Sequence, residues 1–391
     1  MDDATMTEPT RLDHFDLDEQ ELAIREMAQD FARQEIAPHA IEWDETKTFP
    51  IDTLRAAAAL GMGGIYVGEE HGGSGLSRLE AAIIFESLAA GCPSIAAYIS
   101  IHNMTNWMID RFGSDEQRAK YIPDLCTMER LGSYCLTEPG AGSDAAALRT
   151  TAREDGNAFV LNGVKQFISG AGAAEVYIVM ARTGDNGPAG ISAFIIEKDT
   201  PGVSFGPNEK KMGWNAQPTR QVILEDARIP KENLLGELGQ GFKIAMAGLN
   251  GGRLNIGACS LGGGQGALDQ TLTYMSERQA FGKKLSDFQA LQFRLADMAT
   301  ELEAARGLLW RAAAALDAKK PEATRLCAMA KRFATDAGFN AANEALQLHG
   351  GYGYLAEYGI EKIVRDLRVH QILEGTNEIM RLIIGRDLVR D

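Results

Sequence analysis

The spacing of apolar residues changes twice along the chain and predicts three regions. In the first region, apolar residues recur at the i, i+3, i+4 and i+7 positions that one face of a helix presents to a core. Pro38, the glycine-rich segment GEEHGGSGLS and Pro93 interrupt this pattern and separate successive helices. The spacing is clearest at Ile24, Met27, Ala28 and Phe31. We therefore expect an all-helical N-terminal domain over residues 1–130.

The second region has the composition of β-strands. Its short runs are rich in β-branched and aromatic residues and are separated by turn-forming segments such as TGDNGPAG and DTPGVS. The runs are AFVLNGVKQFISG, EVYIVMART, GISAFIIEKD and RQVILEDARIP. This pattern predicts a central β domain over residues 131–240.

Helical spacing returns after Gly241 in two long runs. The second run follows Pro321 and stops at Gly350-Gly351, where a glycine would cap the helix. Apolar residues with this spacing form one face of each helix, and such faces are typical of helices packed nearly antiparallel in a bundle. We expect such a bundle over residues 241–391. The order helix, strand, helix indicates an α+β fold rather than βαβ units. The apolar positions are Leu291, Leu295, Met298, Leu302, Ala305, Leu309, Ala312 and Leu316, then Leu326, Ala330, Phe333, Ala337, Ala341, Ala345 and Leu348.

Composition and charge narrow the classes of function. With 391 residues, 45% of them hydrophobic and 24% charged, the chain suits two or three globular domains. A formal net charge of -15 disfavours nucleic acid and anionic membranes as partners, because the field of the protein repels both. The five cysteines are scattered and odd in number, which predicts neither a disulfide framework nor a CxxC metal site.

The N-terminal stretch MDDATMTEPTRLDHFDLDEQ is acidic and has no targeting pattern. No window of the chain is apolar for long enough to span a bilayer. We therefore expect a cytoplasmic protein, of bacterial type or in its mature form, that does not enter a membrane.

Two patterns that can indicate a site have a better structural interpretation. LGGGQGALD carries the G-x-G-x-x-A spacing through Gly262, Gly264 and Ala267, but the dinucleotide fingerprint needs a preceding strand and here both flanks are helical. Close helix packing is favoured instead. The six histidines show no HExxH or HxH spacing, so no metal site is expected. His370 could titrate together with Glu374, and an ordinary hydrogen-bonded histidine is the favoured interpretation.

One carboxylate has no structural explanation. In QILEGTNEIMR, Glu374 lies between the apolar pair Ile372-Leu373 and a glycine, where burial would penalise the charged form. Thr376 as an N-cap and Glu378 in the first turn fit the start of a helix. A helix that begins at Thr376 gives Glu374 no structural role.

Other short motifs are ambiguous when taken singly. YCLTEPGAGSD predicts a strand that ends in a glycine loop, which either brings backbone N–H groups to a flat or anionic ligand or is a plain turn. NGGR, Asn250 to Arg253, either binds a ligand or is a solvated loop. RQAFG and QLHGGYGY leave the same choice open.

Together these motifs resemble one family. YCLTEPGAGSD, FISG, LNGGR, RQAFG, QLHGGYGY and ILEGTNEIMR occur in the order and spacing of the acyl-CoA dehydrogenases, over nearly the whole chain. The resemblance implies an N-terminal helical domain, a central β-barrel or sandwich domain and a C-terminal four-helix bundle. It also implies noncovalently bound FAD and a homotetramer built as a dimer of dimers.

The resemblance also implies a reaction, the α,β-dehydrogenation of a saturated acyl-CoA, with electrons passed to electron-transferring flavoprotein. KKMGWNAQPTR, GLNGGRLNIGACSLG and HGGYGYLAEYGIEKIVRDLRVHQILEGTNEIMR are similar to the branched-chain member of valine breakdown, which converts isobutyryl-CoA to methacrylyl-CoA. The alternatives are 2-methylbutyryl-, isovaleryl- or butyryl-CoA as substrate. A catalytically silent flavin-binding assembly protein is an alternative of another class.

The site residues implied by the resemblance fall into three groups. Glu374 matches the general base, and its backbone N–H matches one donor to the thioester oxygen. The matched cofactor positions are Tyr134, Leu136, Thr137, Gly142, Ser143, Phe167, Ile168, Ser169, Arg278, Phe281, Phe288, Gln289, Gln347, Gly350, Gly351, Thr376, Asn377 and Glu378. The matched substrate positions are Ser143, Asn250, Gly251, Gly252, Arg253, Leu373 and Arg386.

Overall fold

A computed structural model describes residues 17–389 of the protein. Most of the acidic N-terminal stretch, including His14, lies outside the described residues, so the expectation of no targeting segment stays a prediction. Within the described part, no helix is both long and apolar enough to cross a membrane.

The first part of the chain is helical, as predicted. Three of its helices begin with a capping box, in which the N-cap side chain and the side chain three residues later bond each other's backbone N–H. The N-cap residues are Asp18, Ser77 and Ser114. The helices are α1 (Glu19–Phe31), α2 (Ala40–Thr46), α3 (Ile51–Ala59), α4 (Arg78–Gly91), α5 (Pro93–Phe112) and α6 (Asp115–Cys126).

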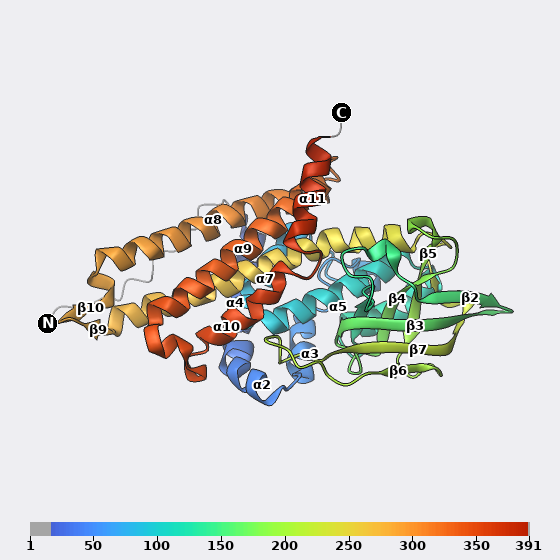
Figure 1. Cartoon of the computed structure of the whole chain (residues 1–391), viewed down its shortest axis with the longest axis horizontal. Helices are drawn as coiled ribbons and strands as arrows, with labels where there is room; N and C mark the ends of the chain where they lie inside the picture. Colours follow the sequence, from blue (N-terminus) through green and yellow to red (C-terminus); the bar gives the residue numbers. More distant parts are fainter. Residues whose placement is uncertain (1–16, 390–391) are drawn as a thin grey trace.

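The middle of the chain forms a sheet at one end of the molecule (Figure 1). Its order among the described strands is β6-β7-β3-β2-β4-β5-β8, and β1 pairs in parallel with β4. All four predicted strand runs are present. The strands are β1 (Gly132–Cys135), β2 (Thr151–Asp155), β3 (Ala158–Ser169), β4 (Val176–Arg182), β5 (Ile191–Glu197), β6 (Val203–Phe205), β7 (Thr219–Pro230) and β8 (Leu234–Leu235).

Long helices form the rest of the chain and lie side by side in Figure 1. Helix α7 (Gly241–Glu277) packs against α4, α5, α8 (Gln289–Asp317) and α9 (Ala323–His349), and α10 (Ile360–Arg368) packs on α9 and α7. The predicted apolar positions of α8 and α9 are buried or packed against the core. A small hairpin of β9 (Gln279–Ala280) and β10 (Lys283–Lys284) links α7 to α8, and α11 (Asn377–Leu388) ends the bundle.

Glycines in α7 allow close helix packing. A Cβ atom on Gly262 would clash with the backbone of α4 at Glu86, and one on Gly338 of α9 would clash with the backbone of α7 at Ser260. The whole LGGGQGALD segment lies inside α7. The preference for helix packing over a dinucleotide fingerprint is therefore confirmed. Helix α9 ends as predicted, with Gly350 at φ +60° as its C-cap.

Candidate active site

Glu374 lies in a short loop between a 3-10 turn (Val369–Gln371) and α11. The backbone there is unusual, because Glu374 has φ +55° and Gly375 has φ +89°. A left-handed conformation is uncommon for glutamate and is often found at functional sites. Thr376 is the N-cap of α11 and accepts from the Ile379 N–H at 3.3 Å, as predicted. The cap leaves the Glu374 side chain unused, also as predicted.

The carboxylate of Glu374 faces α7. A Cβ atom added to Gly252 would lie 2.6 Å from Glu374 Oε2, so only glycine leaves room for the carboxylate. Oε2 is buried and has no hydrogen-bond partner among the described residues. Burial raises the pKa of Glu374 to about 7, while the positive charges of Arg253 and Lys331 act in the opposite direction. This carboxyl group can therefore exchange a proton near neutral pH.

Arg253 lies beside this loop within α7. It is only 5% exposed, its Nη1 donates to Asn250 Oδ1 at 2.8 Å, and its Nε donates to the carbonyl oxygen of Glu374 at 3.4 Å. The alternative in which NGGR is a solvated loop is therefore wrong, because the four residues are helical. Burial lowers the pKa of Arg253. The guanidinium lies next to Glu374, which the assignment of Arg253 as a substrate position did not anticipate.

Two further predicted residues use their side chains within the protein. Asn377 is buried, and its Nδ2 donates to Thr335 Oγ1 at 3.0 Å and Asp336 Oδ1 at 2.8 Å. The hydroxyl of Thr376 serves the cap. Glu378 is exposed in the first turn of α11, and Arg386 is exposed near its end.

The predicted TEPGAGSD loop is shaped by a buried ion pair. Glu138 Oε1 lies 2.7 Å from Lys165 Nζ, and the same carboxylate accepts from the backbone N–H groups of Arg149 and Thr150. The loop leaves Gly142 beside open space and Ser143 exposed. The glycine is therefore not needed for packing, which favours the ligand-binding interpretation over a plain turn.

Groups near this loop present an aromatic face and an unsatisfied hydroxyl. Phe167 has φ +60° after an irregularity in the pairing of β3 with β7, and its side chain is 63% exposed, while Ile168 next to it is buried. The hydroxyl of Tyr134 is buried without a hydrogen-bond partner in the described part of the chain. Burial raises the pKa of Tyr134, and the charge of Glu374 adds to that effect. Tyr134 and the base are therefore near neighbours.

The remaining predicted cofactor residues lie elsewhere. A cavity of about 510 Å³ is lined by Arg278, Gln347, Gly350 and Gly351 at the far end of α9. Gln347 is about 24 Å from Lys331 by helical rise. Phe281, on the β9–β10 turn, is 96% exposed. One chain thus separates the predicted residues into two sites, one around Glu374 and one around this cavity.

His370 is an ordinary buried histidine, as favoured from the sequence. Its Nε2 lies 3.2 Å from Trp214 Nε1 and its Nδ1 lies 2.7 Å from Ser260 Oγ. Burial lowers its pKa to about 3, with the charge of Lys331 adding to the effect. The imidazole is therefore neutral and does not exchange protons with Glu374 near pH 7.

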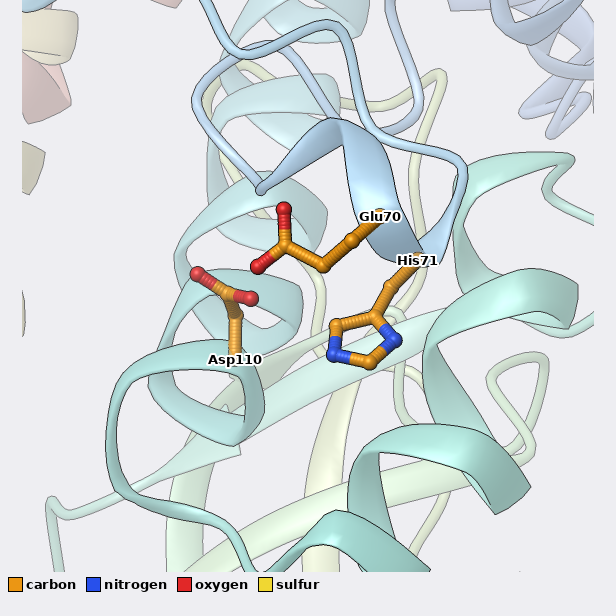
Figure 2. Close-up of side chains that lie close together, drawn as sticks. All are labelled: Glu70, His71 and Asp110. Atoms are coloured by element: carbon orange, nitrogen blue, oxygen red, sulfur yellow. The ribbon is translucent and has the colours of Figure 1, made fainter.

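Figure 2 shows a cluster that the sequence search for metal ligands missed, formed by Glu70, His71 and Asp110. Their ligand atoms lie within 4.8 Å of one another. Motif spacing could not find it, because Asp110 comes from α5 and the other two from a 3-10 turn (Glu69–His71). Burial and the charge of Glu70 raise the pKa of Asp110, while Arg118 and His71 act in the opposite direction.

Known proteins share the domain organisation of this chain. Family models described as the N-terminal, middle and C-terminal domains of acyl-CoA dehydrogenase match residues 18–129, 133–227 and 239–389. The chain belongs to the acyl-CoA dehydrogenase family. Mitochondrial isobutyryl-CoA dehydrogenase from Bos taurus is 55% identical over 375 residues, covering 96% of this chain and 90% of that protein.

Solved structures show the same three-domain fold. Butyryl-CoA dehydrogenase from Megasphaera elsdenii superposes with a TM-score of 0.93 at 38% identity, covering 96% of this chain and all of that one, 100%. A chain from a structure described as the electron transferring flavoprotein of Acidaminococcus fermentans gives a TM-score of 0.94 at 41% identity, with 96% and 100% coverage. The predicted fold class is confirmed.

Acyl-CoA dehydrogenases bind FAD, and the residues of this chain fit that cofactor. The exposed ring of Phe167 can lie against a flat heterocycle, and Gly142 leaves space for one. Gly350 and Gly351 have open space beside their backbone, and Arg278 offers a cation to a phosphate. The buried, unpartnered hydroxyl of Tyr134 lacks an acceptor or donor that a ligand can supply.

Proposed function

We propose that this protein dehydrogenates short branched acyl-CoA thioesters, converting isobutyryl-CoA to methacrylyl-CoA in valine breakdown. The observation that carries the proposal is Glu374, a carboxylate with an unpartnered buried oxygen and a pKa raised to about 7. A general base works best when its pKa lies near the working pH. The 55% identity to an isobutyryl-CoA dehydrogenase supports the choice of substrate.

In the proposed reaction Glu374 removes the α-proton of the thioester. When bound, FAD supplies the acceptor for the hydride from the β-carbon. The backbone N–H of Glu374 is held at φ +55°, and we assign it as one donor to the thioester oxygen. A donor fixed in advance stabilises the charge that develops on that oxygen, and losing one typically costs about 100-fold or more in rate.

The substrate pocket is proposed to be short. Leu373, next to the base, packs on a small cluster of Ala97, Trp214 and Ile256. A flexible aliphatic side chain at that position accommodates a methyl branch at the α-carbon. Such a pocket distinguishes one methylene by only about 1–3 kcal/mol, so activity on 2-methylbutyryl-CoA and butyryl-CoA is expected at lower efficiency. Ser143, Asn250, Gly251 and Arg386 stay proposed contacts of the coenzyme.

Two alternatives are less well supported. In isovaleryl-type relatives an earlier helix supplies the base, but GLNGGRLNIG in α7 has no carboxylate, and a side chain at Gly252 would meet the carboxylate of Glu374. A catalytically silent flavin-binding assembly protein has no use for a desolvated carboxylate, which costs free energy to bury. The family assignment and Glu374 together favour an enzyme.

We infer that the protein acts as a homotetramer that passes electrons to electron-transferring flavoprotein. The inference about assembly rests on the separation of the two sites, because the cavity at Arg278 lies far from the base and the neighbouring Phe281 ring is almost fully exposed. A partner subunit would bring the two sites together around one FAD. The domain limits 1–130, 131–240 and 241–391 and the cytoplasmic location stay predictions.

An anaerobic titration tests the proposed function. The purified FAD-loaded protein is mixed with isobutyryl-, 2-methylbutyryl-, isovaleryl- and butyryl-CoA, and bleaching of the flavin band is followed. We expect the fastest bleaching with isobutyryl-CoA. A clear preference for butyryl-CoA would overturn the substrate assignment, and absence of bleaching with every ester would overturn the enzymatic one.

A further inference from the structure

A fully buried ammonium group lies behind the loop that carries the base. Lys331, on α9, is 0% exposed. Its Nζ donates to the carbonyl oxygen of Gly375 at 2.8 Å and to Asn377 Oδ1 at 3.0 Å. Among the described residues, no carboxylate lies within ion-pair distance of this ammonium. Its two acceptors belong to residues that immediately follow Glu374.

Burying a lysine without an ion pair is costly. An ammonium loses its hydration in the interior, and two neutral acceptors replace only part of it. Burial accordingly lowers the pKa of Lys331 to about 8, and the negative charge of Glu374 raises it again in part. An apolar side chain of the same length would leave the Gly375 carbonyl and Asn377 Oδ1 without this donor. The ammonium is therefore tied to the backbone of the Glu374 loop.

The loop is tied to α9 on both of its sides. Before Glu374, Gln371 Nε2 donates to Asp336 Oδ1 at 2.8 Å. After it, Asn377 donates to Asp336 and Thr335 and accepts from Lys331. The left-handed backbone at Glu374 and Gly375 needs such anchors, because strained conformations persist only where their surroundings hold them.

The charged groups around the base come from several elements. On α7, Arg253 acts on Glu374 more strongly than Lys331 does, and both favour the ionised carboxylate. Burial raises the pKa of Tyr134 of β1 and of Tyr66, which precedes α4, and the charge of Glu374 adds to both shifts, least at Tyr66. The groups that act on Lys331 are Glu374, Arg253, Asp336 of α9 and Glu378 of α11. His370 is neutral and adds no charge.

We propose that Lys331 is a positioning residue of the active site: it holds the Glu374 loop through the Gly375 carbonyl and Asn377, and it supplies part of the positive field that stabilises the ionised base. The inference rests on the proposed function, in which Glu374 is the base. It assigns two separable contributions, a hydrogen bond that fixes geometry and a charge that sets the proton affinity of the carboxylate.

Two variants separate these contributions. Lys331→Gln keeps a donor but removes the charge, and Lys331→Met removes both while filling a similar volume. In both variants the rising limb of kcat/KM against pH should move to higher pH, on the order of one unit. The ionised carboxylate of Glu374 loses a neighbouring positive charge that stabilises it. In Lys331→Met alone the limiting rate above the limb should also fall, about 100-fold for a base displaced by about 1 Å.

A matched control removes the same charge elsewhere. Lys198→Gln, in the β domain, should leave both the limb and the limiting rate unchanged. Thermal unfolding at pH 7 tests for a purely structural role of Lys331. If Lys331 had only that role, its variants would lower the melting temperature and the amount of active enzyme without moving the limb. The Gln variant keeps a donor toward the loop and so remains available if the Met variant does not fold.

The outcomes distinguish this inference from the proposed function. If the limb of the wild type disappears in Glu374→Gln and shifts in both Lys331 variants, the inference stands. If Glu374→Gln abolishes the limb but Lys331→Gln leaves it at the wild-type pH, Lys331 does not act on the base and the inference is wrong. If Glu374→Gln retains normal activity and limb, the proposed function itself fails.

Discussion

The two sites of this acyl-CoA dehydrogenase differ in how complete they are within one chain. Around Glu374, contacts from α7, α9 and α11 converge, and the loop is held by Arg253, Lys331 and Asn377. Around the cavity at Arg278, glycines face open space and Phe281 is almost fully exposed. The first site is held in place by hydrogen bonds from several elements, whereas the second is open on one side.

This difference separates chemistry from cofactor retention. The proton acceptor and the residues that set its pKa are supplied by a single subunit, so the reactivity of the carboxylate does not require a partner. In the proposed homotetramer, retention of FAD would depend on assembly, because a partner subunit would cover the exposed site. Variants of the two sites should therefore affect different measurements.

Glu374→Gln should have the largest effect. The amide cannot accept the α-proton, so kcat should fall by about 100- to 10,000-fold, the usual contribution of a general base. FAD content and elution volume on gel filtration should match the wild type, because the amide has nearly the shape of the carboxyl group and leaves the proposed cofactor contacts unchanged. Anaerobic bleaching by isobutyryl-CoA measures the loss, and persistent bleaching would contradict the assignment.

Gly252→Ala should have the next largest effect. The new methyl group would lie 2.6 Å from Glu374 Oε2 and must displace the carboxylate. A shift of about 1 Å costs about 100-fold in rate, with FAD content unchanged. Gly385→Ala on α11 is the matched control, because no atom lies within 4 Å of its added Cβ. Equal activities of the two variants would show that α7 does not confine the base.

Arg278→Gln should affect the second site only. Loss of a charge-assisted hydrogen bond to phosphate is worth about 1.5–3 kcal/mol, which predicts FAD binding at least about 10-fold weaker. The turnover of FAD-saturated enzyme should be unchanged. The control is Lys283→Gln on β10, which removes a nearby charge outside the cavity lining. If Arg278→Gln changed the pH limb of turnover instead, the separation of the two sites would be wrong.

Thr376→Ala should have the smallest effect. Loss of the N-cap hydrogen bond at the start of α11 should lower the free energy of unfolding by about 1 kcal/mol, measured by urea denaturation. Thr376→Ser keeps the acceptor and should behave as the wild type. A loss well above that in the alanine variant would mean that the cap also holds the Glu374 loop.

Much of the fold could be predicted from local sequence alone. The apolar positions of α8 and α9 follow from the 3.6-residue period of a helix, and the four β runs follow from their β-branched and aromatic content between turn segments. The stop of α9 at Gly350 and the cap at Thr376 were predictable for the same local reason. Glu374 could be found because a carboxylate between Leu373 and Gly375 has no local explanation.

Contacts between distant segments could not be predicted in this way. Lys331 looks like an ordinary polar residue of a helix, and only the fold places it under a loop more than forty residues later. Gly252 and Glu374 lie more than 120 residues apart in the sequence and meet only in the fold. The sequence left two interpretations of NGGR, a loop or a ligand site, because glycine has a low helix propensity. In the structure, tertiary packing overrides that preference and the motif is part of α7.

The central claim is that Glu374 is a desolvated carboxyl group whose pKa lies near the working pH. Infrared difference spectra over a pH series, with the Glu374 band assigned by its absence in Glu374→Gln, measure this directly. We predict a midpoint of about 7, because burial raises the pKa from 4.5. A midpoint near 4.5, the value of an exposed glutamate, would contradict the account.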